Sequence, residues 1–316
     1  MLRFALRKLL TMAATMLAAS FVIFGSLSLA PGDPETFLIR SRTVSEEFRA
    51  AVRAQFMLDE PFLLRYVHWL GAVLRGDLGT SLVFREQVTG LLASRITTTI
   101  WLVGYASILI VVLGGGLGLL AGLRGRGVLD NTIVVGTTAG LAVPSFVAAT
   151  ALVSIFSMTL GWFPASGGGE GPVGTIHHLT LPACALAVSS LAVMTQTTRA
   201  AIRGELARDH VATAVSRGLP WRRVVGRHVV RNALIPVTTV AGVTIPSLIA
   251  GAIIVEQAFG LNGVGGYLVQ SINARDFPVV QAICLVLVGA FVLANTVVDL
   301  LYGVLDPRVR LGGAAL

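Results

Sequence analysis

Residues 209–236 read DHVATAVSRGLPWRRVVGRHVVRNALIP. This stretch is strongly basic, compatible with helix, and placed between two long apolar runs. At its middle, residues 218–220 read Gly-Leu-Pro; glycine ends helices well, and proline suits the first position of the next helix. The stretch therefore predicts two short helices joined by a tight turn, the first over 206–216 and the second from 220 towards 236.

The composition of the whole chain predicts an integral membrane protein. Of its 316 residues, 54% are hydrophobic and 13% are charged, whereas a soluble domain carries roughly 25% charged residues. The net charge of +8 comes from basic residues that flank apolar runs, which is typical of membrane topology and not of a nucleic-acid groove. Cys184 and Cys284 lie in apolar runs without a CxxC or histidine-rich neighbourhood. We therefore expect neither a nucleic-acid partner nor a metal or redox site.

Six apolar stretches are long enough to cross a bilayer, which takes about 20 residues. They are Leu9–Ala30, Ile96–Leu123, Thr132–Phe163, Leu179–Thr198, Asn232–Val255 and Phe277–Val298. The first is longer than the roughly 7–15 residues of a secretion signal's apolar region, so we expect it to be retained. The third is longer than one crossing needs, so we expect it to tilt, to project beyond the bilayer or to end in a loop.

The placement of basic residues predicts the orientation in the membrane. With the N-terminus inside, the inner segments hold Arg3, Arg7, Lys8, Arg124, Arg126, Arg199, Arg203, Arg208, Arg217, Arg222, Arg223, Arg227, Arg231, Arg308 and Arg310. The two short outer loops hold only Arg275. Because basic residues near spans stay inside, both termini are predicted to lie in the cytoplasm.

The long outer segment 31–95 is predicted to form a small helical cap, with a plain connector as the alternative. Thr43–Glu46 has the pattern of a capping box and precedes apolar residues at helical spacing. A second helix is expected from Pro61 to Gly76. The chain thus divides into an N-terminal span (1–30), the outer segment (31–95), a five-span core (96–305) with an inner loop at 199–232, and a tail (306–316).

The glycines of the second span have a packing explanation. Gly114, Gly115, Gly116, Gly118 and Gly122 let one transmembrane helix approach another closely. A phosphate-binding P-loop would instead need a Gly-Lys-Ser or Gly-Lys-Thr ending, and the chain has a single lysine, close to its N-terminus. If ATP drives a process here, a separate subunit must bind it.

The basic inner stretch fits a docking element better than a lipid contact. A short helix presented at the membrane surface can lay one face into a groove of a soluble partner. The alternative is contact with anionic lipid, at about 1 kcal/mol per basic residue near the surface. Lipid contact does not require the Gly-Leu-Pro break, nor His228, Asn232 and Pro236 at four-residue spacing.

The chain resembles the permease subunits of ATP-binding-cassette importers. The resemblance is closer to the B-type permease of dipeptide and oligopeptide transporters, a group that also includes nickel and glutathione importers. Its inner-loop signature is present as Ala212-Thr213-Ala214, then Gly218, His228, Asn232 and Pro236. Further matching motifs are Pro31–Pro34, Leu58–Pro61, Tyr66–Leu70, Arg75–Ser81, Pro144–Phe146, Trp162–Gly167, Arg275–Gln281 and Asn295–Arg308. Together they cover nearly the whole chain.

The resemblance implies a type I importer permease fold and a set of partners. In that family the inner hairpin contains the coupling helix that contacts the ATPase, a role carried here to Asp209–Leu219. The predicted coupling-loop residues are Asp209, Ala212, Ala214, Gly218, Leu219, Arg222, His228, Asn232 and Pro236. The implied partners are a second, homologous permease, two ATPase subunits that bind ATP and magnesium, an extracytoplasmic peptide-binding protein and membrane lipid. The implied substrates are short peptides, with nickel and glutathione as alternatives.

The sequence departs from the family pattern at three places. Ala212 stands where many relatives have arginine, and the broader superfamily glutamate. His210 stands where peptide permeases often have tyrosine, and Phe259–Gly265 replaces an aromatic-Pro-Gly-Leu-Gly turn. The first two departures concern details of ATPase contact, and the third keeps the glycines that a turn needs.

Acidic residues near the spans need partners, because a charge at the bilayer centre costs roughly 2.5–3.5 kcal/mol. Glu256 ends the fifth span, and Asp299 and Asp306 lie at the inner end of the sixth. Pairing with an arginine is the favoured interpretation; the alternative is that Glu256 lines the outer gate and meets a substrate amine. Pro144 and Ser145, with Glu256 and Asp299, are the candidate pathway or gate residues.

Two other functional classes are not favoured. A stand-alone secondary transporter would more often show inverted repeats and an ionisable site at the membrane midplane, and neither is found. A membrane-embedded enzyme would need a nucleophile, a base or metal ligands that converge. His177 and His178 are adjacent in an outer loop without a third ligand nearby. We therefore expect a translocation subunit without catalytic residues and without a cofactor of its own.

Overall fold

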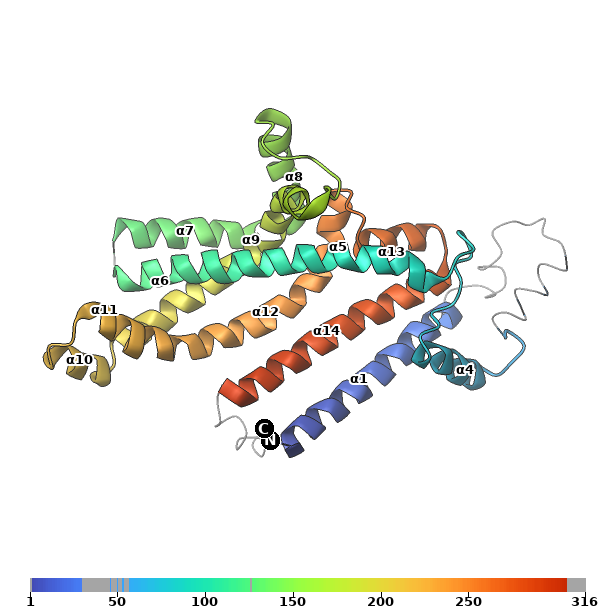
Figure 1. Cartoon of the computed structure of the whole chain (residues 1–316), viewed down its shortest axis with the longest axis horizontal. Helices are drawn as coiled ribbons and strands as arrows, with labels where there is room; N and C mark the ends of the chain where they lie inside the picture. Colours follow the sequence, from blue (N-terminus) through green and yellow to red (C-terminus); the bar gives the residue numbers. More distant parts are fainter. Residues whose placement is uncertain are drawn as a thin grey trace.

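The computed structural model describes residues 2–29, 57–125 and 127–305, together with Glu46, Ala50 and Arg53 (Figure 1). Within these residues the chain forms helices joined by turns, with one isolated antiparallel bridge between Thr80 and Gln87. Apart from Glu46, Ala50 and Arg53, the helix expected after the capping box Thr43–Glu46 lies outside the described residues, as do the Pro31–Pro34 motif, Asp306 and the tail.

Five helical runs are long and apolar enough to cross a membrane. The first is Ala5–Ser26 within α1 (Leu2–Leu29), and the second is Val88–Leu123, which joins α5 (Val88–Leu109), the π-helical segment η1 (Ile110–Gly114) and α6 (Gly115–Leu123). The third is α9 (Gly171–Leu206). The fourth is Trp221–Ala258, which joins α11 (Trp221–Val224), the π-helical segment η3 (Val225–Val230) and α12 (Arg231–Ala258). The fifth is Phe277–Leu300 within α14 (Phe277–Leu305).

The remaining predicted span, Thr132–Phe163, is a broken one. Helix α7 (Val128–Ala142) meets α8 (Ser145–Leu152) and its π-helical continuation η2 (Val153–Thr159) at an angle of 106°. Pro144 lies at the break and forces the residue before it out of the helical region; Val143 is accordingly extended. The stretch is longer than one crossing needs because it holds two helices.

The basic inner stretch is arranged differently from the prediction. Helix α9 ends at Leu206, and α10 (Asp209–Ser216) begins after a two-residue break, so the expected helix over 206–216 starts too early. The second expected helix does not stop near Pro236: the run from Trp221 continues through Pro236 and Pro246 into the membrane span. Prolines are tolerated inside packed transmembrane helices because neighbouring groups satisfy the carbonyls that they free.

The two ends of the helix bundle differ in their short helices. Helices α10 and α11 lie at the left end in Figure 1, and α4 (Phe62–Leu74) and α13 (Val264–Asn273) lie at the right end. Helix α4 packs on α1 through the aromatic rings of Phe21, Phe24, Phe62, Tyr66 and Trp69. It confirms the helix expected from Pro61, whereas α13 was not predicted.

Helix α9 forms the centre of the bundle and packs against α5, α6, α7, α8 and α12. Glycines make the contact with α6 close. A Cβ atom at Gly118 would lie 2.5 Å from the Thr195 carbonyl oxygen, and one at Gly122 would lie 2.7 Å from Ile202. Gly114 packs in the same way, which confirms the packing explanation for these three glycines. Gly115 and Gly116 have no such neighbour.

Candidate functional site

The turn after α10 is closed by the predicted glycine stop. Gly218 has φ +74°, a conformation that glycine adopts without steric cost. Its N–H donates to the Val215 carbonyl at 2.9 Å, and the Leu219 N–H donates to the Ala214 carbonyl at 3.3 Å. These two bonds form a Schellman motif, in which the residue after the glycine packs back on the helix. Leu219 contacts the cluster that contains Ala214.

The hairpin formed by α10 and α11 has a hydrophobic core of its own. Val211 and Ala214 of α10 are buried against Ile202 of α9 and against three residues of the run that follows, Val224, Val229 and Ala233. A helix held on both sides moves together with the spans that flank it. Ala214, only 5% exposed, therefore belongs to the hairpin core and is not available to a partner.

Other residues of the hairpin are exposed, and some of them are apolar. We call the exposed residues Ala212, Val215 and Trp221, together with the exposed Arg217, Arg222 and Arg223, the docking face. The Val215 side chain is 50% exposed and that of Trp221 is 53% exposed. An exposed tryptophan with arginines at its edge is the composition of protein interfaces. Of the predicted coupling-loop residues, the structure thus places Ala212 and Arg222 on this surface.

A carboxylate that the sequence analysis did not select holds the base of the hairpin. Glu205, 8% exposed at the end of α9, forms an ion pair with Arg208 at 3.0 Å and lies 3.6 Å from His210 Nε2. The Asn232 amide donates to Glu205 Oε2 at 3.4 Å and to the His228 carbonyl at 2.9 Å. The predicted residues His228 and Asn232 are therefore brought together, around a residue that was missed.

A sequence signal for Glu205 existed. It is the only acid between Gly171 and Asp209, and it lies where an apolar span ends among arginines. Its partners on α10 and α12 depend on how the helices pack, which spacing along the chain does not give. Asp209 is the first residue of α10, where a negative charge stabilises a helix N-terminus.

A second ion cluster joins α7 to α9 at the same end of the bundle. Asp130, 2% exposed, accepts from Arg199 Nε at 2.5 Å and from Arg199 Nη2 at 2.8 Å, and it lies 2.8 Å from Arg203 Nη2. Arg203 also donates to the Gly125 carbonyl at 2.8 Å, in the turn between α6 and α7. These contacts tie the C-terminal part of α9 to the start of α7 and to the turn before it.

The four predicted pathway residues do not form one site. Pro144 and Ser145 lie at the break between α7 and α8. Asp299 of α14 forms an ion pair with Lys8 of α1 at 2.6 Å. The prediction of an arginine partner for Asp299 is therefore wrong, because the partner is a lysine. Both side chains are half-exposed, as the ends of spans allow.

Glu256 caps a helix that the sequence analysis missed. Its side chain is fully buried and accepts from the Thr99 hydroxyl at 2.6 Å and from the N–H groups of Gly265 and Gly266 at 2.7 and 3.2 Å. Those amides open α13 and have no partner within their own helix. The arginine expected beside Glu256 is wrong, and in this conformation the carboxylate has no surface that a substrate could touch.

Further polar contacts fix α13 in place. The Arg95 guanidinium lies 3.8 Å from the centroid of the Tyr267 ring and donates to Asn262. Burial raises the pKa of Tyr267, which keeps its phenol neutral. Asp276, 1% exposed, accepts from the Ser81 hydroxyl at 2.5 Å and so ties the turn before α5 to the start of α14. These contacts hold α13 and the start of α14 against the N-terminal part of α5 and the turn before it.

His177 and His178 have local partners. His177 Nε2 lies 3.1 Å from the Trp162 carbonyl, and His178 Nδ1 lies 3.0 Å from the Gly174 carbonyl. Among the residues that the structure describes, no three His, Cys, Asp or Glu side chains are grouped to hold a metal ion.

Comparisons with solved structures agree with this fold. The chain is similar to a structure of the MetNI methionine ABC transporter in an inward-facing conformation, with a TM-score of 0.58, 15% identity, and 68% of this chain and 96% of that chain covered. It is also similar to a crystal structure of an amino acid ABC transporter, with a TM-score of 0.54, 19% identity, and 68% and 94% covered.

Sequence relatives cover almost the whole chain. The oligopeptide transport system permease protein AppB of Bacillus subtilis is 34% identical over 318 residues, which is 98% of this chain and 100% of AppB. The glutathione transport system permease protein GsiC of Salmonella choleraesuis is 35% identical over 310 residues, 98% of this chain and 99% of GsiC.

Family descriptions match both parts of the sequence. Residues 1–103 match the family described as the N-terminal part of binding-protein-dependent transport system membrane components. Residues 114–311 match the family described as the binding-protein-dependent transport system inner membrane component. The chain belongs to this family of multi-pass inner membrane permeases of ABC importers.

Proposed function

We propose that this chain imports short peptides across a bacterial cytoplasmic membrane, with both termini in the cytoplasm. The relatives support this substrate class by their names: AppB is named for oligopeptides, and GsiC for glutathione, which is itself a tripeptide. The positive-inside distribution of basic residues supports the orientation.

The observation that carries the proposal is the docking face. It presents Ala212, Val215 and Trp221 on a hairpin whose other side is packed on α9 and α12. We assign this face to a soluble ATPase subunit, because a helix with an exposed apolar face and a basic rim fits a groove on a partner. ATP and magnesium bind to that subunit, since this chain lacks the lysine of a P-loop.

The complete importer has further parts in this proposal. A second, homologous permease completes the translocation path, each permease docks one ATPase subunit, and an extracytoplasmic binding protein delivers the peptide. Closure of the two ATPase subunits pulls the hairpins together. The hairpin core passes this movement to α9 and α12, and Asp130 passes it to α7 through Arg199. Rigid-body movement of the spans then alternates access between the two sides.

Glutathione import is the second candidate function. GsiC matches this chain at 35% identity, level with the 34% of AppB, so overall similarity does not rank the two substrates. Neither relative is named for nickel, which leaves that alternative with the family resemblance alone.

The test uses the purified complex of permeases, ATPases and binding protein in nanodiscs. Peptide-loaded binding protein is expected to stimulate ATP hydrolysis, and Val215→Glu on the docking face is expected to remove that stimulation. Gln270→Glu is the matched control, since Gln270 is exposed on α13 at the other end of the bundle. Transport by the isolated chain without ATPase subunits would overturn the proposal. Stimulation by loaded glutathione-binding protein, and not by peptide-loaded protein, would select the second candidate.

A further inference from the structure

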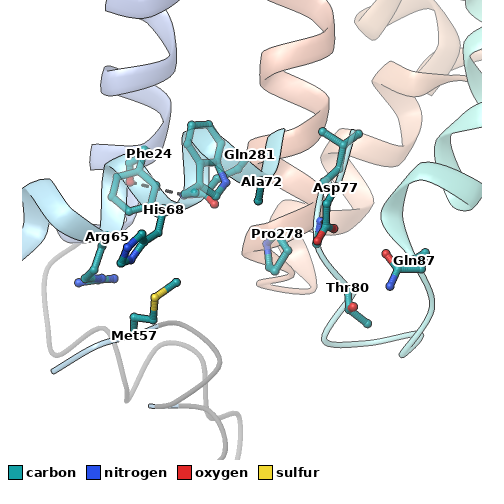
Figure 2. Close-up of a pocket in the computed structure, with 13 residues that line it drawn as sticks. Phe24, Met57, Arg65, His68, Ala72, Asp77, Thr80, Gln87, Pro278 and Gln281 are labelled. Atoms are coloured by element: carbon teal, nitrogen blue, oxygen red, sulfur yellow. Dashed lines mark hydrogen bonds between the residues drawn. The ribbon is translucent and has the colours of Figure 1, made fainter. Parts of the chain in front are cut away.

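A pocket lies at the end of the bundle opposite the hairpin, between α1, α4, the turn before α5 and the start of α14 (Figure 2). Its volume is about 350 Å³, at the lower end of the roughly 300–1,000 Å³ of small-ligand sites. The lining combines aromatic and aliphatic surface from Phe24, Trp69 and Pro278 with several polar side chains. The size therefore fits a small ligand with both apolar and polar parts.

The two charged side chains that line the pocket, Arg65 and Asp77, lie at opposite ends of it. Figure 2 shows Arg65 and His68 at one end and Asp77, Thr80 and Gln87 at the other, with Pro278 between them. A ligand that satisfies both ends must carry a negative group and a positive group some distance apart.

The Arg65 side chain has an incomplete set of hydrogen-bond partners. Its Nε is buried and has no hydrogen-bond partner among the described residues. The guanidinium lies 5.9 Å from the Phe24 ring centroid, and burial lowers the pKa of Arg65. A buried donor without an acceptor destabilises the structure, and a carboxylate matches the fork of a guanidinium. An anionic group in the pocket would supply the missing acceptor.

Asp77 offers the complementary charge. Its Oδ1 accepts from the Gly79 N–H at 2.9 Å, which orients the carboxylate. The side chain is exposed and forms no ion pair within the described part of the chain. An ammonium group in the pocket would find this carboxylate and the side-chain oxygens of Thr80 and Gln87 beside it.

We propose that this pocket binds a short peptide by its two charged ends, with the carboxylate on Arg65 and the ammonium group on Asp77. Trp69 supplies the apolar surface between them. The inference rests on the proposed peptide function and adds to it a substrate site on this chain alone, on the side where substrate arrives. A zwitterion of two or three residues meets all three requirements of size, charge and apolar contact.

The experiment measures equilibrium binding of radiolabelled dialanine to the permease–ATPase complex, without binding protein, in phosphatidylglycerol nanodiscs. Dialanine is expected to bind at least tenfold more tightly than its N-acetyl or C-amide derivative. Arg65→Gln is expected to lower the affinity for dialanine at least tenfold and to leave the affinity for the C-amide unchanged. Asp77→Asn is expected to lower the affinity for dialanine at least tenfold and to leave the affinity for the N-acetyl derivative unchanged. Arg75→Gln is the matched control, since Arg75 follows the same helix and does not line the pocket.

Three results would overturn the inference. They are equal affinity for dialanine and its capped derivatives, no effect of Arg65→Gln or Asp77→Asn, and no binding at all. Phosphatidylethanolamine carries the same pair of charges. Binding of this lipid that depends on Arg65 and Asp77, without binding of dialanine, would assign the pocket to the lipid headgroup instead.

The failure of this inference differs from the failure of the proposed function. If the complete importer takes up peptides while the pocket binds none, only the pocket assignment is wrong. If the importer with its binding protein takes up no peptide, the proposed substrate class is wrong whatever the pocket binds.

Discussion

Two buried glutamates, one at each end of the bundle, hold short helices in different ways. Glu256 is fully buried and accepts from a hydroxyl and two backbone amides at 2.6–3.2 Å. Glu205 keeps 8% of its surface exposed, and its partners are the side chains of Arg208, His210 and Asn232 at 3.0–3.6 Å. One anchors α13 through the backbone, and the other holds α10 through side chains.

This difference between the two glutamates indicates which end of the bundle adjusts during transport. Breaking the Glu256 contacts leaves buried amides without acceptors, which costs a full desolvation penalty for each group. The partners of Glu205 are exposed side chains, which can exchange their contacts with Glu205 for water without unfolding a helix. Elements that transmit conformational change are drawn from the less stable parts of a fold. We therefore expect the hairpin end to adjust during transport while the α13 end keeps its internal structure.

The largest effect is expected from Glu256→Leu. Leucine fills the space but leaves the Gly265 and Gly266 amides without their acceptor, at about 1–3 kcal/mol for each group; the Thr99 hydroxyl keeps the Arg95 carbonyl as an acceptor. Thermal unfolding of the purified complex should show a loss of several kcal/mol in stability. Gln270→Leu, exposed on the same α13, is the control. An unchanged stability of the Glu256→Leu variant would contradict the role of Glu256 as the cap of α13.

Aspartate substitutions at two positions of α10 separate the hairpin core from the docking face. Ala214→Asp places a charge in the buried cluster, which costs several kcal/mol unless the hairpin opens, whereas Val215→Asp alters only an exposed position. Both variants should insert in the membrane and lose coupling between ATP hydrolysis and uptake. Only Ala214→Asp should raise hydrogen exchange in α10. Equal exchange in the two variants would contradict the buried position of Ala214.

The turn itself gives an intermediate effect. At φ +74°, Gly218→Ala should cost roughly 1–2 kcal/mol. Gly218→Pro should cost more, because proline cannot adopt a positive φ and removes the N–H that bonds Val215. Both variants should fold and insert, with coupling reduced in Gly218→Ala and lost in Gly218→Pro. Normal coupling in Gly218→Pro would show that the hairpin is only a connection between spans.

The smallest effect is expected from Glu205→Gln. The amide keeps an acceptor for Asn232 but loses the ion pair with Arg208, so the change in stability should be only about 1 kcal/mol. Binding-protein-stimulated ATP hydrolysis should fall a few-fold, while the melting temperature of the complex falls by only a few degrees. Glu170→Gln, exposed at the start of α9 and away from this cluster, is the control. A drop in melting temperature as large as that of Glu256→Leu would show that the two ends are equally rigid.

Much of this architecture could be predicted because its signals are local. Apolar runs gave five of the crossings, and the glycine stop at 218 follows from residue type alone. The bend in Thr132–Phe163 had a signal in Pro144, but a proline inside a span is also compatible with a continuous helix, as Pro246 shows. Helix α13 contains two glycines near its start, and its capping group comes from another helix.

The residues of the candidate site could be named from the sequence, but which of them are exposed could not. Resemblance to the importer permeases assigned the coupling loop to the stretch that forms the hairpin, yet it treated Ala212 and Ala214 alike. Their opposite exposure depends on how α10 rotates against α9 and α12, which is set by the packing of Val211 and Val224. Glu205 was missed in part for the same reason: Arg208 is a neighbour three residues along the chain, but Asn232 reaches Glu205 only through the packing of α12 on α9.

Cross-linking of the assembled complex tests the central claim, that the docking face contacts an ATPase, most directly. In a background with Cys184 and Cys284 replaced by serine, Ala212→Cys should cross-link to an ATPase subunit through a short bifunctional reagent. Ala214→Cys, buried in the same helix, and Gln270→Cys, at the other end, should not. If Ala212→Cys forms no cross-link in a complex whose ATP hydrolysis responds normally to loaded binding protein, the docking face is not the site of coupling.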